Sequence, residues 1–95
     1  MRVRFTPLGR ARWLAAIAFI HEDNPAAARR LVRQAERRLK RLERFPDSGR
    51  KLPEFPSLPH REVVVRPYRF FYRVVADTVW IVDVWHSAQD PRAPR

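Results

Sequence analysis

The 95-residue chain has no cysteine and a formal net charge of +10, from 18 Arg and 2 Lys against 10 acidic residues. This length fits one domain with a single modest core, and the absence of cysteine excludes a disulfide framework and a thiolate metal site. The longest apolar run, Trp13 to Ile20, is too short to span a bilayer, and the first residues do not form the apolar segment of a signal peptide. We therefore expect a soluble, cytoplasmic protein. The charge favours an anionic partner, although codon composition of the source genome also explains the preference for Arg over Lys.

The first 23 residues predict a strand followed by a helix. Arg2 to Phe5 alternate in polarity, which indicates a short strand within residues 1–6. Thr6 and Pro7 then supply a hydroxyl cap and a proline at the first helical position. In a helix that ends near Asp23, one apolar stripe would consist of Leu14, Ile17, Ala18 and His21, widened by Trp13, Phe19 and Ile20.

Asn24 and Pro25 repeat the capping pattern and also end the preceding helix, because a residue before proline avoids the α region. The next segment has apolar residues at helical spacing: Ala28, Leu31, Val32, Ala35, Leu39 and Leu42. Residues 7–45 should therefore form an antiparallel helical hairpin. The second helix also carries a strongly basic side that includes Arg30, Arg33, Arg37 and Arg41. We expect these residues to bind an anionic partner; a merely solvated face is the alternative.

The rest of the chain predicts a connection, a meander and a tail. Residues 46–60 contain four prolines and a glycine, so we expect a stiff connection that is either a functional loop or a simple crossover. Residues 61–86 contain three runs rich in β-branched and aromatic residues, which indicates a three-stranded meander. Residues 87–95 should form a flexible tail. The predicted fold is a single α+β domain in which the hairpin packs on a small antiparallel sheet.

Tight turns at residues 67–68 and 76–78 would set a register that pairs Arg66 with Arg69, Val64 with Phe71, Glu62 with Arg73 and Val75 with Val79. Alternation then gives an apolar face toward the hairpin, made of Val63, Val65, Phe70, Tyr72, Val74, Trp80, Val82 and Val84. We call the opposite side the mixed face; its members are Glu62, Val64, Arg66, Arg69, Phe71, Arg73, Ile81, Asp83 and Trp85. Two arginines directly opposed are unfavourable unless an anion binds them or one bends into solvent. Large apolar groups among charges indicate a face that a partner covers.

Residues for enzyme chemistry are few. Gly9 and Gly49 are the only glycines, and no G-x-S-x-G sequence is present, which argues against nucleotide-dependent and serine-hydrolase chemistry. The histidines lack ligand spacing, so a metal site from Asp83, His86 and Asp90 is weakly supported, and we expect no metal and no cofactor. His86 is the one candidate acid or base; alternatively it completes the apolar face and hydrogen-bonds locally.

Four segments together resemble the RelE/ParE superfamily of type II toxins: NPAAARRLVRQ from Asn24, LERFPDSGR from Leu42, PYRFFYRV from Pro67 and VDVWHSAQDP from Val82. The order of predicted elements is similar too. The resemblance implies a bacterial toxin that forms a hetero-oligomer with a cognate antitoxin, whose C-terminal segment wraps around the toxin. Combined with the mixed face, it points to an antitoxin contact through Arg69, Phe71, Arg73, Ile81 and Trp85.

The superfamily has two branches with different activities. RelE-like members cut messenger RNA on the ribosome, and here Arg66, Arg69 and His86 would carry that chemistry. However, no tyrosine follows Tyr72, and residues 87–89 are Ser, Ala and Gln where basic residues are expected. ParE-like members inhibit DNA gyrase and need no ribonuclease residues, so the ParE-like branch is preferred and no catalytic residue is expected. A binding module that has lost toxicity is a third alternative.

Overall fold

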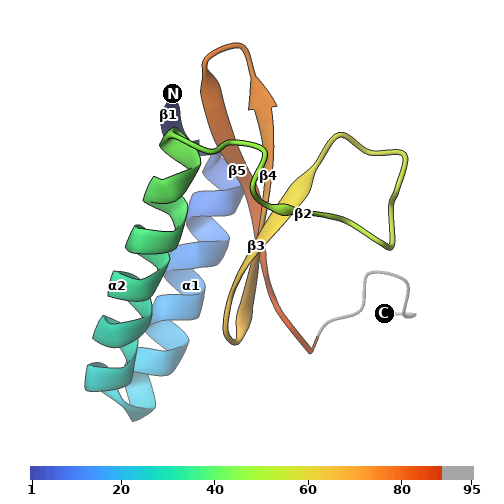
Figure 1. The fold of residues 1–95 in the computed structure, drawn as a ribbon. Coiled ribbons are helices and arrows are strands. Elements are labelled where there is room, and N and C mark those ends of the chain that lie inside the picture. Colours follow the sequence, from blue (N-terminus) through green and yellow to red (C-terminus); the bar gives the residue numbers. More distant parts are fainter. Residues whose placement is uncertain (89–95) are drawn as a thin grey trace.

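The computed structural model describes residues 1–88, which form two helices on one face of a five-stranded sheet (Figure 1). The strand order is β1-β5-β4-β3-β2, with β1 parallel to β5 and the other neighbours antiparallel. No helix in this range is long and apolar enough to cross a membrane. The elements are β1 (Arg2–Phe5), α1 (Pro7–Asp23), α2 (Pro25–Lys40), the 3-10 turn η1 (Arg41–Glu43), β2 (Arg50–Lys51), β3 (Arg61–Val65), β4 (Tyr68–Val75) and β5 (Thr78–His86).

The predicted α+β architecture is confirmed, with two additions. The first strand is parallel to the last, so the sheet is mixed, not antiparallel throughout. The proline-rich connection also contains the two-residue strand β2, which pairs with the start of β3. The predicted tail falls largely on residues 89–95, which lie outside the described part of the chain.

Both predicted helix starts are present, and each depends on a side-chain cap. The Thr6 hydroxyl accepts a hydrogen bond from the Gly9 amide at 3.1 Å, and the Asn24 side chain accepts one from the Ala27 amide at 3.0 Å. The Asn24 amide also donates to the Ile20 carbonyl at 2.9 Å, so this residue ends α1 and begins α2. Asn24 alone therefore connects the two helices, in agreement with the tight connection that the sequence predicts.

The inner faces of the two helices differ in how well the sequence predicts them. In α2 the expected positions Ala28, Leu31, Ala35 and Leu39 are buried. In α1 the expected stripe is correct only in part. Trp13, Ile17 and Ile20 face inward as expected, together with Gly9 and Ala16. However, Leu14 is 51% exposed and Phe19 68% exposed, and Ala18 and His21 also face solvent. Gly9 permits the close approach to β5, because a methyl group there would clash with the Ile81 carbonyl.

The β3–β4 register differs from the predicted one by two residues. Val64 lies opposite Arg69 and Glu62 lies opposite Phe71, so the expected Arg66–Arg69 and Glu62–Arg73 pairs do not form. The turn comprises Arg66 and the cis proline Pro67 and so begins one residue earlier than expected. Because the shift is even, Val63, Val65, Phe70 and Tyr72 keep their predicted buried face, but Val74, also expected there, is 37% exposed near the β4–β5 turn.

A β-bulge in β5 reverses which of its side chains face the helices between the bulge and the β4–β5 turn. Phe71 pairs with Asp83 but Tyr72 pairs with Ile81, which leaves Val82 as an extra residue. Consequently Val79 and Ile81 are fully buried beside the helices, whereas Trp80 and Val82 are only half-buried. Ile81 was expected on the mixed face, and that placement is wrong.

The β4–β5 turn holds a strained alanine. Val75 pairs with Thr78, not with Val79 as expected, so the turn has two residues, and the first of them, Ala76, has a φ of 54°. A side chain in this left-handed region is unfavourable, and glycine avoids the cost. Ala76→Gly should therefore raise the free energy of unfolding by about 0.5–1 kcal/mol, measured by urea denaturation. Ala18→Gly, on the exposed side of α1, should instead lower it by about 1 kcal/mol; equal effects of the two changes would contradict the turn argument.

Candidate functional site

The structure contains the mixed face, but contacts within the protein already bury part of it. Phe71 and Trp85 lie on the side of the sheet away from the helices, with ring centroids 5.1 Å apart in an edge-to-face arrangement. The Arg69 guanidinium sits 4.9 Å from the centre of the Phe71 ring. Phe71 is only 6% exposed, so it is not the free apolar surface that the sequence suggested. Arg73 is exposed and Trp85 half-buried, and these two remain available to a partner.

Beside the aromatic pair lies a buried ionic cluster that the sequence did not predict. Glu62 is 1% exposed and Arg69 is 7% exposed. The Arg69 Nε donates to Glu62 at 2.6 Å, and its terminal nitrogen lies 3.0 Å from Glu54 in the proline-rich connection. The Arg50 Nε donates to the second Glu62 oxygen at 2.9 Å. We call Arg50, Glu54, Glu62 and Arg69 the ionic cluster; it fixes the connection to the sheet.

Electrostatics within the cluster favour the charged forms of Arg69 and Glu54. The hydrogen bond to Glu62, supported by Glu54, raises the pKa of Arg69 despite the cost of burial. The hydrogen bond from Arg69 lowers the pKa of Glu54. Two carboxylates thus neutralise the one buried guanidinium, and Arg69 has no uncompensated charge with which to attract an external anion.

Because of the cluster, the free energy of unfolding should depend on pH below 4.5, the ordinary pKa of Glu54. A carboxylate with a lowered pKa in the folded state stabilises the fold fully above pH 4.5, and this contribution is lost as pH falls through the lower folded value. Glu54→Gln should remove this component, giving a variant whose urea midpoint changes less between pH 5 and pH 3.5 than that of the parent. A parallel decline in both proteins would contradict the assignment to Glu54.

His60, at the end of the proline-rich connection, should make the free energy of unfolding depend on pH in a second, higher pH range. Its Nδ1 is buried and has no hydrogen-bond partner among residues 1–88. Burial, followed by the charge of Arg73, lowers the pKa of His60 from its ordinary 6.5. Folding therefore opposes protonation, and stability that is fully present above pH 6.5 declines as pH falls below that value. We expect His60→Gln to abolish the decline between pH 7 and pH 5.5 in urea titrations, whereas Glu54→Gln leaves it intact.

The residues proposed for RNA cleavage do not form a site with three free groups. Arg66 is exposed in the β3–β4 turn, but Arg69 is held in the ionic cluster. His86 ends β5 opposite Tyr68, lies edge-on to its ring at 5.5 Å, and accepts a hydrogen bond from the Ala88 amide at 3.1 Å. The local hydrogen bond expected of His86 is therefore present, although the residue itself is exposed.

The candidate target-binding and metal-binding residues lie in different parts of the structure. Arg30, Arg33, Arg37 and Arg41 are all exposed. Arg33 lies beside Ile17 and His21 of α1, whereas Arg37 and Arg41 lie toward β3. No three His, Cys, Asp or Glu side chains in residues 1–88 are grouped to hold a metal ion; Asp90 of the weak metal candidate lies beyond that range. Asp83 instead accepts hydrogen bonds from the Val84 amide and the Trp85 indole, each at 2.8 Å.

The sequence and the fold of this chain are similar to those of known proteins. Residues 3–91 match the family described as "ParE toxin of type II toxin-antitoxin system, parDE". The chain belongs to the ParE toxin family. A solved structure described as "Chromosomal ParDE TA system from P. aeruginosa" shares the fold, with a TM-score of 0.74 and 18% sequence identity over 90% of this chain and 95% of that one. No curated protein sequence matches the chain.

Membership of the ParE toxin family confirms the predicted superfamily and the preferred branch. It also identifies the protein as a toxin of a type II toxin–antitoxin system. Within this ParE-family chain, the sequence analysis did not predict that Arg50 and Glu54 belong to a structured site. Their partners lie on other elements, and the sequence predicted residues 46–60 only as a stiff connection.

Proposed function

We propose that this ParE-family toxin inhibits DNA gyrase and is neutralised by a cognate antitoxin. The match of residues 3–91 to the ParE family carries the proposal. The ionic cluster supports it, because an arginine held by two carboxylates is poorly placed to stabilise the phosphorane of metal-free RNA cleavage. The RelE-like activity is therefore the outcome to be excluded by experiment.

The proposed contacts use the surfaces that remain exposed. Arg30, Arg33, Arg37 and Arg41 give the outer side of α2 and η1 a positive charge suited to an acidic region of the target. Arg73 and Trp85 are the accessible part of the mixed face, and we assign them to the antitoxin. On this proposal the target and antitoxin contacts would use different sides of the sheet.

Purified protein should block the supercoiling of relaxed plasmid by gyrase or trap cleaved DNA. Arg30→Gln with Arg33→Gln should weaken this inhibition about tenfold, because two charges of the proposed target surface are lost. Arg2→Gln with Arg4→Gln, on β1, removes the same charge elsewhere and serves as the matched control. Intact supercoiling together with cleavage of ribosome-bound messenger RNA would overturn the proposal in favour of the RelE-like activity.

The antitoxin can be tested in living cells. Induced expression of the chain alone should arrest bacterial growth, and co-expression of the reading frame beside its gene should restore it. Unimpaired growth on expression of a folded chain would instead support a binding module without toxicity.

A further inference from the structure

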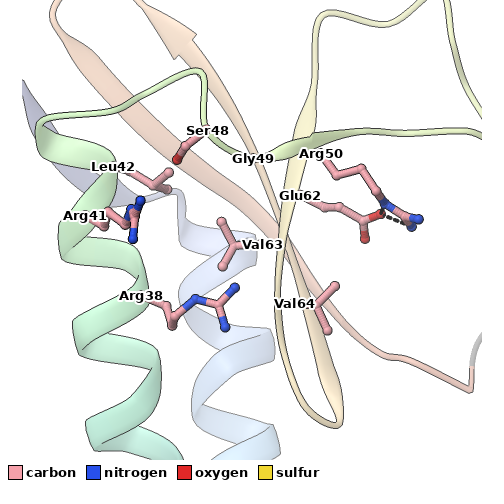
Figure 2. Close-up of a pocket in the computed structure, with 9 residues that line it drawn as sticks. All are labelled: Arg38, Arg41, Leu42, Ser48, Gly49, Arg50, Glu62, Val63 and Val64. Atoms are coloured by element: carbon pink, nitrogen blue, oxygen red, sulfur yellow. Dashed lines mark hydrogen bonds and ion pairs between the residues drawn. The ribbon is translucent and has the colours of Figure 1, made fainter.

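The second helix carries far more positive charge than its own acidic residues balance. Residues 25–44 contain seven Arg and one Lys against two Glu, and all eight basic residues are exposed. None of the eight forms an ion pair within the described part of the chain. Figure 2 shows this for Arg38 and Arg41, which have no marked partner, whereas Arg50 of β2 is joined to Glu62. These guanidinium groups are therefore available to an external anion.

Four of these arginines form a row along the helix axis. They follow one another at intervals of three, four and four residues, so they share one side of the helix, opposite the four buried residues of α2. At a rise of about 1.5 Å per residue, the row is about 16 Å long. We call it the arginine row; its members are Arg30, Arg33, Arg37 and Arg41.

A line of like charges of this length matches the backbone of nucleic acid. One strand of a DNA duplex presents a phosphate about every 3.4 Å along the axis, so about five phosphates would lie along the row. Each guanidinium can donate two parallel hydrogen bonds to one phosphate. Arg41 and Arg44 also lie over the Phe45 ring, 5.5 and 5.8 Å from its centre. A guanidinium stacked on a ring keeps its in-plane donors for a phosphate.

An acidic protein matches this surface less well than DNA does. Protein interfaces contain apolar or aromatic anchors at their centre, which fill pockets of the partner. No exposed residue of α2 has an apolar side chain larger than that of Pro25. Protein–DNA interfaces, in contrast, are polar and positively charged. The composition of the exposed side of α2 therefore favours DNA.

A duplex matches the surface better than a single strand does. Proteins that bind single strands provide aromatic rings on which the bases stack. Helix α2 contains no aromatic residue, and the nearby Phe45 ring already has two guanidinium groups over it. Contacts from the row would therefore reach phosphates and not bases.

We infer that the arginine row binds the phosphate backbone of double-stranded DNA, without preference for base sequence. The lack of preference follows because phosphate contacts position a protein on DNA but do not read its sequence. That the bound duplex is the DNA held by gyrase rests on the proposed function, whereas binding of free duplex does not. The toxin would then contact the DNA of its target as well as the target protein.

The test uses the full purified chain, a short fluorescein-labelled duplex and fluorescence anisotropy at several salt concentrations. A plot of the logarithm of the association constant against that of the salt concentration should have a slope of about −3.6, the value for four phosphate contacts. Arg33→Gln with Arg37→Gln should reduce the slope to about −1.8. Arg33→Lys with Arg37→Lys keeps the charge and should restore the slope, which excludes a loss through misfolding.

The matched control is Arg2→Gln with Arg4→Gln on β1, which removes the same charge and should change the slope by less than about 0.5. An unchanged slope in the Arg33→Gln, Arg37→Gln variant, or an equal reduction in the control, would overturn the inference. Tighter binding of a single strand, or binding of one base sequence only, would also overturn it. A glutamate polymer of equal charge that binds more tightly than the duplex would instead indicate an acidic protein partner.

The inference and the proposed function can fail separately. Anisotropy with free duplex involves no gyrase, so a chain that binds DNA but leaves supercoiling intact would support the inference and contradict the proposed function. Blocked supercoiling by a chain that does not bind free duplex would overturn the inference and leave the proposed function standing.

Discussion

Replacing Glu62 with alanine should lower the free energy of unfolding by about 3–5 kcal/mol, because it leaves a buried arginine without its main partner. Arg69 is 7% exposed and would retain only Glu54, which lies on the proline-rich connection. Arg50 would lose its carboxylate as well. Urea denaturation at pH 7 measures the effect. Glu54→Ala, at the rim of the cluster, should cost about 1 kcal/mol, and a larger loss there than at Glu62 would contradict this ranking.

A double variant separates the loss of a partner from the loss of packing. When both members of a buried pair become apolar and of similar size, the desolvation cost disappears with the charges. Glu62→Leu combined with Arg69→Met should therefore be more stable than Glu62→Leu alone, by about 1–2 kcal/mol. If the double variant is less stable than the single one, the buried charge of Arg69 is not what makes the single change costly.

The second large effect is expected at Gly49, where the proline-rich connection meets the sheet. A methyl group on Gly49 would meet the Tyr72 ring and hydroxyl at 2.5 Å and the Glu62 carbonyl oxygen at 2.8 Å. The Gly49 amide also donates to the Tyr72 hydroxyl at 2.9 Å, and that hydroxyl donates to the Pro46 carbonyl at 2.6 Å. Gly49→Ala should therefore lower the free energy of unfolding by about 2–4 kcal/mol, through overpacking and the loss of buried hydrogen bonds.

Neighbouring changes provide the comparison for Gly49. Ser48→Ala alters an exposed residue of the same segment and should change stability by less than about 0.5 kcal/mol. Tyr72→Phe removes the hydroxyl but keeps the ring, and it should cost about 1–3 kcal/mol because the Gly49 amide is left unpaired. Thermal unfolding of the three variants tests this order, which a tolerated alanine at Gly49 would contradict.

Local signals explain why the helices could be predicted. Thr6, Asn24 and the prolines that follow them specify both helix starts without reference to the rest of the chain. The spacing in α2 is equally local and separates a basic side from an apolar one. In α1 apolar residues surround the helix, so Leu14 and Phe19 fit the inner face as well as Ile20 does. The choice between them depends on contacts with β5 that the helix sequence does not contain.

Prediction of the sheet failed where one residue changes the register. Strands β1, β3, β4 and β5 were predicted and the short β2 was not. No glycine or proline marks the extra Val82, and Ile81 was therefore placed on the wrong face. The ionic cluster was missed for a related reason. Arg69 pairs with Glu62 and Glu54, 7 and 15 residues away, and the second contact requires a particular path of an irregular segment. Of the expected antitoxin-binding residues, Arg73 and Trp85 remain accessible.

The pairing of β1 with β5 has a consequence for how the toxin is made. The first strand has its neighbour more than 70 residues later in the chain, at Thr78 to Ile81. During translation strand β1 therefore stays unpaired until Thr78 to Ile81 have left the exit tunnel. Premature termination before Thr78 removes this neighbour and the buried side chains of Val79, Ile81 and Val84. A product that ends before Thr78 would thus lack part of the core, so the folded toxin can form only after residues 78–84 have been synthesised.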